Sequence, residues 1–68
     1  MAAGYTAGVR KFKGPWERRV VGDTLREVKR NLAKAAGLAV RTADSLPVGK
    51  SNIPNGGIWH QAKIESKQ

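Results

Sequence analysis

Residues 24–36 carry their hydrophobic side chains with the period of an α-helix. The apolar stripe consists of Leu25, Val28, Leu32, Ala35 and Ala36. Thr24 and Glu27 have the S/T-x-x-E spacing of a capping box, in which each side chain accepts a backbone N–H at the start of a helix. Gly37 follows, where a left-handed residue commonly ends a helix. The pattern predicts one capped, amphipathic helix over residues 24–36.

Two shorter segments have the character of β-strands. Residues 9–21 are rich in β-branched and aromatic residues on both sides of a Gly-Pro turn signal at 14–15, so we predict a two-stranded hairpin. Trp16 and Val20 are expected to be partly buried in it. Residues 58–64 alternate between two sets of side chains, which predicts a strand, with a short helix as the alternative.

The remaining segments lack a clear period. Residues 1–8 are small, and we expect them to be flexible, with Tyr5 as the one side chain suited to dock on the core. Residues 38–46 fit either a short helix or an extended segment. An Asn-Gly pair at 55–56 favours a hairpin turn. The polar residues 66–68 are predicted to form a loose tail.

These elements combine into a single small basic domain over residues 9–65. We predict an α+β fold in which one central amphipathic helix packs on a small antiparallel sheet formed by residues 9–21 and 58–64. A helix-turn-helix with a short β element is the alternative. A chain of 68 residues fits one domain. It buries only about 60% of its unfolded surface, so the core is expected to be marginal.

Composition narrows the chemistry. There is no cysteine and a single histidine, His60, so neither a disulfide nor a cysteine zinc site is available and we expect no metal and no cofactor. No apolar run approaches the roughly 18 residues of a membrane span. The first residues lack the pattern of a secretory signal, so a cytoplasmic location without membrane contact is expected.

Charge points to the kind of partner. Thirteen Lys and Arg against five Asp and Glu give a net charge of +8. A strongly basic small domain has the electrostatic signature of a nucleic-acid binder. The alternative is a basic surface that meets an acidic protein. DNA and RNA are both left open, and so is a homodimer.

Nine of the thirteen basic residues form two groups along the chain. Around the predicted hairpin are Arg10, Lys11, Lys13, Arg18 and Arg19, and along the predicted helix are Arg26, Lys29, Arg30 and Lys34. Arg26, Arg30 and Lys34 recur at i, i+4, i+8, where like charges repel. We therefore interpret these three as a basic ridge that contacts phosphates, against the alternative of a solvated helix face.

Two tryptophans are candidates for stacking on unpaired bases, although core burial is the stronger interpretation of Trp16. For Trp59 both roles are open. We find no catalytic arrangement: Gly49 and the two residues after it resemble the end of a phosphate-binding loop, but the first glycine of that motif would fall at Asp44. The protein is therefore interpreted as non-enzymatic.

Residues 32–49 read L-A-K-A-A-G-L-A-V-R-T-A-D-S-L-P-V-G and resemble the helix-turn-helix of lactose-repressor-type regulators, V-A-K-x-A-G-V-S-x-x-T-V-S-R-V-L-N-G, with a looser match to residue 53. The resemblance implies DNA binding, with Val40, Arg41 and Ser45 at base edges in the major groove. The departures are a missing serine cap, a negative charge near phosphate and a proline late in the second helix, at Ala39, Asp44 and Pro47.

A second resemblance covers residues 23–50, which are similar to the central helix and following strand of the ubiquitin-like β-grasp. It is carried by Asp23-Thr24-Leu25, Val28-Lys29, Leu32, Gly37-Leu38 and Gly49-Lys50. The resemblance implies a platform for protein interactions. Two functions are thus expected: a small, regulatory nucleic-acid-binding protein, or a non-enzymatic interaction module, such as an inhibitor or an assembly subunit, with an acidic partner.

Overall fold

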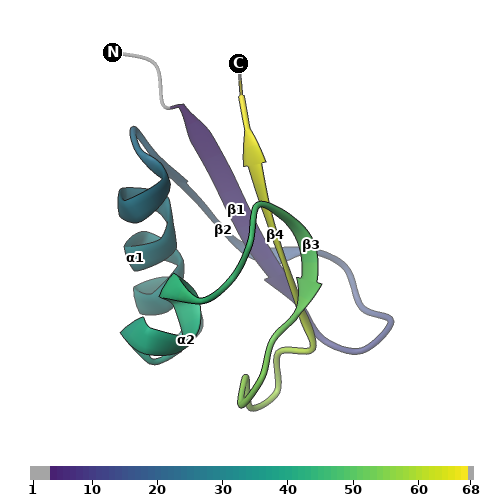
Figure 1. The fold of residues 1–68 in the computed structure, drawn as a ribbon. Coiled ribbons are helices and arrows are strands. Elements are labelled where there is room, and N and C mark those ends of the chain that lie inside the picture. Colours follow the sequence, from purple (N-terminus) through teal and green to yellow (C-terminus); the bar gives the residue numbers. More distant parts are fainter. Residues whose placement is uncertain (1–3, 68) are drawn as a thin grey trace.

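The computed structural model describes residues 4–67 and has an α+β fold, as the sequence predicts. The elements in chain order are β1 (Tyr5–Arg10), β2 (Glu17–Gly22), α1 (Leu25–Ala36), α2 (Val40–Asp44), β3 (Gly49–Asn52) and β4 (Gln61–Ser66). The strands form one antiparallel sheet in the order β2-β1-β4-β3. Both helices lie on the same side of this sheet (Figure 1). We call that side the covered face and the other side the open face.

Helix α1 begins and ends as its sequence predicts. The Thr24 hydroxyl accepts the Glu27 N–H at 3.1 Å, and the Glu27 carboxylate accepts the N–H of Asp23 at 3.0 Å. Gly37 ends the helix with φ 70°, a left-handed conformation that costs glycine no steric penalty. The helix and its cap are therefore confirmed.

The apolar stripe of α1 rests on the covered face. Val28 and Leu32 are fully buried, and Ala33 is buried beside them. The core also takes in residues from all parts of the chain: Ala7, Val9, Leu46, Ile53, Trp59, Ala62 and Ile64. The helix approaches β2 closely, because a Cβ atom placed on Gly22 would lie 2.5 Å from the Val28 nitrogen. Only glycine permits this contact.

The predicted hairpin forms, but its first strand starts earlier than expected. Residues 5–8 belong to β1, so the prediction of a flexible segment over residues 1–8 is wrong for them. Small side chains hid the alternation: Ala7 and Val9 face the core, while Thr6 and Gly8 occupy the alternate positions on the other face of the strand. Tyr5 packs against the core from its edge. Residues 1–3 lie outside the described part of the chain.

The C-terminal strand is shifted toward the end of the chain. It covers residues 61–66 rather than 58–64, so Ser66 is part of the sheet and not of a loose tail. Lys67 extends the pairing, since its N–H donates to the Gly4 carbonyl at 2.9 Å. Residue 68 lies outside the described residues.

The segments that the sequence left open are now assigned. Residues 40–44 form the short helix α2, which packs against α1 through buried Ala43. The Asn-Gly pair at 55–56 does lie in a turn, with Asn55 at φ 56°. This turn is part of a longer loop, residues 53–60 between β3 and β4, and is not a two-residue hairpin connection. Trp59 of the same loop reaches into the core.

Candidate functional site

The open face carries a row of basic side chains that spans the sheet, with one basic residue on each of β2, β4 and β3 and a glycine on β1. Lys50 on β3 lies directly opposite Lys63 on β4, and Lys63 lies opposite Gly8 on β1. Arg19 of β2 completes the row, since its Cγ atom is 3.6 Å from the position of a Cβ on Gly8. We call Lys50, Lys63 and Arg19 the basic row. Strand alternation points all three away from the core.

The basic row is electrostatically unfavourable by itself. Like charges directly opposite each other on neighbouring strands destabilise a sheet. Within residues 4–67, one ion pair offsets the row: the Lys63 ammonium lies 3.6 Å from the Glu65 carboxylate. Both of these side chains are partly solvent-exposed, and such pairs contribute little. The row therefore retains a net positive charge.

A second row of side chains lies at the hairpin end of the open face and holds Arg10 in place. It consists of Arg10, Gln61 and Asn52, which are linked by hydrogen bonds. The Arg10 Nε donates to the Gln61 Oε1 at 2.8 Å, and the Gln61 amide donates to the Asn52 Oδ1 at 3.1 Å. These three residues are cross-strand partners on β1, β4 and β3. The chain of hydrogen bonds orients the guanidinium in advance of any ligand, which reduces the entropy lost on binding.

Trp16 lies on the open face between the two rows. The Arg10 guanidinium carbon is 5.1 Å from its ring centroid, and the Lys63 ammonium is 5.3 Å from it. Both distances allow cation–π attraction. Beside the ring is a groove of about 400 Å³, lined by Thr6, Gly8, Trp16, Arg19, Val21 and Lys63, among others. The small residues of β1 form its floor.

The five basic residues around the hairpin do not form one cluster. A bulge places Arg18 and Arg19 together opposite Gly8, and Arg18 has φ 55°. Arg19 consequently faces the groove, whereas Arg18 and Lys11 turn toward Trp59, at 5.8 and 5.9 Å from its ring centroid.

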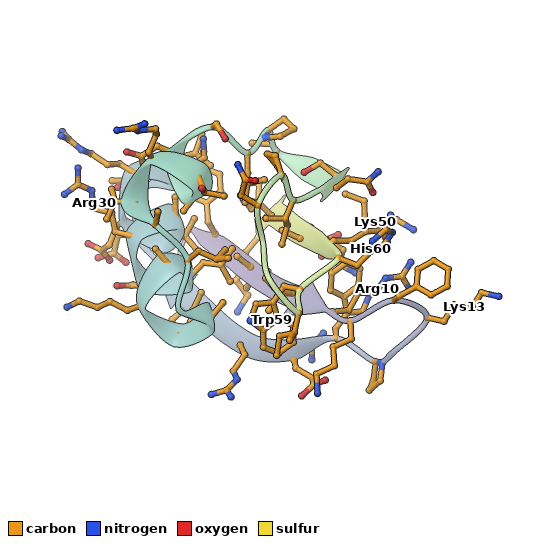
Figure 2. The ribbon with its side chains drawn as sticks, turned by 90° about the horizontal axis from the view of Figure 1, so that it is seen from below. Arg10, Lys13, Arg30, Lys50, Trp59 and His60 are labelled. Atoms are coloured by element: carbon orange, nitrogen blue, oxygen red, sulfur yellow. The ribbon has the colours of Figure 1, made fainter. Side chains whose placement is uncertain are left out.

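Lys13 lies apart from the basic row. It projects from the tip of the hairpin (Figure 2). The tip also carries Phe12, whose ring meets His60 edge-on with centroids 5.1 Å apart. The backbone N–H of His60 donates to the Arg10 carbonyl at 2.8 Å, which ties the hairpin to the loop before β4.

The helix ridge of Arg26, Arg30 and Lys34 forms a separate basic surface. All three side chains are exposed on α1. Figure 2 shows Arg30 on the opposite side of the molecule from Arg10 and Lys50. Lys29 is set apart from the ridge, since its ammonium donates to the Asp44 carbonyl on α2 at 3.2 Å. The protein thus presents two basic surfaces that face in different directions.

The remaining residues predicted to touch nucleic acid lie away from the open face. Trp59 is 6% exposed and its Nε1 donates to the Ala36 carbonyl at 2.9 Å, so this indole is a core residue and not a stacking platform. Val40 and Arg41 are exposed at the start of α2. The Ser45 hydroxyl donates to the Thr42 carbonyl at 2.7 Å, within its own turn. Helix α2 has five residues, Val40–Asp44.

Two residues of the basic row were missing from the sequence prediction. Lys63 lies between buried Ala62 and Ile64, so the alternation along the strand already indicated that the Lys63 side chain points outward. Lys50 gave no such signal, because β3 is only four residues long and its partner is thirteen positions further along the chain. Register alone brings the two lysines together.

Comparison with known protein families, with curated proteins and with solved structures finds no match. Among residues 4–67, no helix is long and apolar enough to cross a membrane. The same residues contain no group of three or more histidine and acidic side chains that could hold a metal ion. Function is therefore inferred from the geometry and charge of the open face.

Proposed function

We propose that the protein binds nucleic acid through the open face of its sheet. The observation that most strongly supports this proposal is the basic row. Its Lys50 and Lys63 are direct cross-strand partners on the face opposite both helices. Phosphates placed along the row would relieve its repulsion and release condensed counterions, which is the main source of affinity for nucleic-acid backbones. Arg10 adds a pre-oriented guanidinium in the neighbouring row, on the other side of Trp16.

The helix ridge is the competing surface for the same function. Its three side chains stand on one helix at i, i+4 spacing, an arrangement that solvated helices also show. The open face differs in two respects: its charges are spaced by paired strands, and an aromatic ring and a groove lie among them. Aromatic side chains beside basic ones are typical of surfaces that bind nucleic acid. We therefore assign the main contact to the open face.

The test compares two triple charge reversals. Arg19→Glu, Lys50→Glu and Lys63→Glu remove the basic row, and Arg26→Glu, Arg30→Glu and Lys34→Glu remove the ridge. Each set lowers the net charge of +8 by the same six units, so each is the matched control of the other. Binding is measured by fluorescence anisotropy with a labelled duplex, a single strand and a structured RNA, over a salt series. Circular dichroism verifies the fold.

We expect the affinity of the basic-row variant to fall at least about 100-fold, because the three substitutions remove three cations that bind phosphates. Its salt dependence should also become shallower, by about 0.9 in log K against log salt for each duplex phosphate that the variant no longer neutralises. The ridge variant should lose less than about a tenth as much. Equal losses in the two variants would contradict the assignment to the open face. No binding of any ligand by the unmodified protein near 100 mM salt, approximately physiological ionic strength, would overturn the function and favour an acidic protein partner.

A further inference from the structure

We infer that the groove beside Trp16 holds an unpaired base, so that the open face prefers single-stranded nucleic acid to duplex. This inference rests on the proposed function and adds the class of ligand. The observation that supports it is the placement of one partly exposed indole at the wall of a groove that is lined by Gly8 and rimmed by Arg19 and by Lys63 with its ion-pair partner Glu65.

The groove has the dimensions and lining for such a ligand. Its volume of about 400 Å³ falls within the range of small-molecule pockets, roughly 300–1,000 Å³. Thr6 and Gly8 on β1 keep the floor low, while longer side chains of β2 and β4 rise on either side. Val21, which is 52% exposed, adds an apolar side chain to the lining. A flat aromatic ring suits this shape better than an extended backbone does.

Trp16 supplies the stacking surface. Unlike Trp59, it lies outside the buried core. The Arg10 guanidinium carbon and the Lys63 ammonium both lie over the indole ring, at 5.1 and 5.3 Å from its centroid. A base stacked on this ring would have its flanking phosphates near those cations, because a nucleotide carries its phosphate next to its base. Stacking of a base on an aromatic side chain contributes about 1–3 kcal/mol and tolerates any base.

The two flanking cations differ in how firmly they are held. Arg10 is fixed by its hydrogen bond to Gln61 and can remain against the ring. Lys63 makes a long ion pair of 3.6 Å with Glu65, and its side chain is 32% exposed. It is therefore free to swing toward a phosphate when a base enters. Entry of the ligand thus requires movement of one flexible lysine and leaves the sheet unchanged.

A duplex does not use the groove in this way. Its bases are stacked and paired inside the helix, so the sheet would contact only phosphates, through the rims of the groove. A single strand can contact the same phosphates and in addition insert a base. The difference in affinity between the two ligands therefore measures the contribution of the groove separately from the contribution of the charge.

The test uses a 12-nucleotide oligothymidylate and a duplex of equal length at the same salt, followed by anisotropy and by tryptophan emission. The single strand should bind more tightly and quench emission, since Trp16 stacks while Trp59 remains in the core. Trp16→Phe should retain binding within about threefold, because phenylalanine also stacks, but abolish the quench. Trp16→Ala should weaken single-strand binding about 5- to 150-fold, which corresponds to a loss of about 1–3 kcal/mol, and leave duplex binding unchanged.

Gly8→Val is the second variant, because it fills the groove floor without changing charge or removing the indole. It should also weaken binding of the single strand selectively, and urea unfolding verifies that each variant is folded.

Equal binding of single strand and duplex, with no effect of Trp16→Ala on either, would overturn the inference and leave phosphate binding on the open face intact. Equal loss for both ligands in a folded Trp16→Ala variant would show that the indole only positions Arg10 and Lys63, and would also overturn it. Binding of neither ligand by the unmodified protein would instead overturn the proposed function.

Discussion

The two faces of the sheet are built from alternate residues of the same strands. On the central strands, Ala7 and Ile64 face the core and are buried, whereas their neighbours Gly8 and Lys63 line the groove on the open face. The covered face is apolar and closely packed, and the open face is basic and hollowed. Residues next to each other in the chain therefore contribute to different properties: folding on one side and, in the function that we propose, ligand contact on the other. Paired substitutions at the two faces can separate these roles.

The largest difference in the free energy of unfolding is expected between substitutions of the two tryptophans. Trp59→Ala should lower the free energy of unfolding by about 3–5 kcal/mol, because it leaves a cavity beneath the end of α1 and removes the hydrogen bond to Ala36. Trp16→Ala should lower it by less than about 1 kcal/mol, since that indole lies outside the core. Urea unfolding followed by circular dichroism measures both. Similar losses in the two variants would show that the open face also carries the stability of the fold.

The next-largest difference in stability is expected between substitutions of two glycines. A Cβ on Gly22 would lie 2.5 Å from the Val28 nitrogen on the covered side, whereas a Cβ on Gly8 meets its nearest atoms at 3.4 and 3.6 Å. Gly22→Ala should therefore cost about 1–3 kcal/mol as α1 is pushed from the sheet, and Gly8→Ala should change stability by no more than about 0.5 kcal/mol. Thermal unfolding should show a drop of at least about 4 °C for Gly22→Ala alone. A comparable drop for Gly8→Ala would contradict the division between the faces.

Substitutions of two adjacent residues of β3 should change the stability by less, and in opposite directions. The Ser51 hydroxyl is buried on the covered side without a hydrogen-bond partner among the described residues, while the Asn52 side chain accepts from Gln61 at the surface. Removing a buried unsatisfied group is favourable, so Ser51→Ala should raise stability by about 0.5–1 kcal/mol. Asn52→Ala should lower it by about 0.5 kcal/mol through loss of an exposed hydrogen bond. Destabilisation by Ser51→Ala, measured by urea unfolding, would show that the hydroxyl has a partner after all.

The smallest expected change in stability comes from single charge reversals. Lys50→Glu converts a repulsive cross-strand pair with Lys63 into an attractive one and should stabilise the protein by about 0.2–1 kcal/mol. Arg30→Glu relieves repulsion along α1 by about 0.2–0.5 kcal/mol. The two variants should differ in function: only Lys50→Glu should weaken nucleic-acid binding several-fold in the anisotropy assay. Equal weakening would indicate that overall charge, and not the open face, controls affinity.

Much of the fold was predictable from local patterns. The helix, its threonine cap and its glycine end all depend on residues within one segment, and the hairpin depends on a turn signal between two β-rich stretches. The first half of β1 was missed because alanine and glycine give a weak alternation. Trp59 was left between two roles, because a loop residue reaches the core only through the path of the loop.

The sequence by itself determined the net charge, the amphipathic helix and the α+β class, because these follow from composition and from the spacing of residues that are close in the chain. Only the tertiary structure decided which basic residues lie together on one face. The register of β3 on β4 places Lys50 opposite Lys63, and the bulge in β2 turns Arg19 and Arg18 to different sides. Both depend on pairing between distant segments, and a shift of one residue in either would move these side chains to the other face.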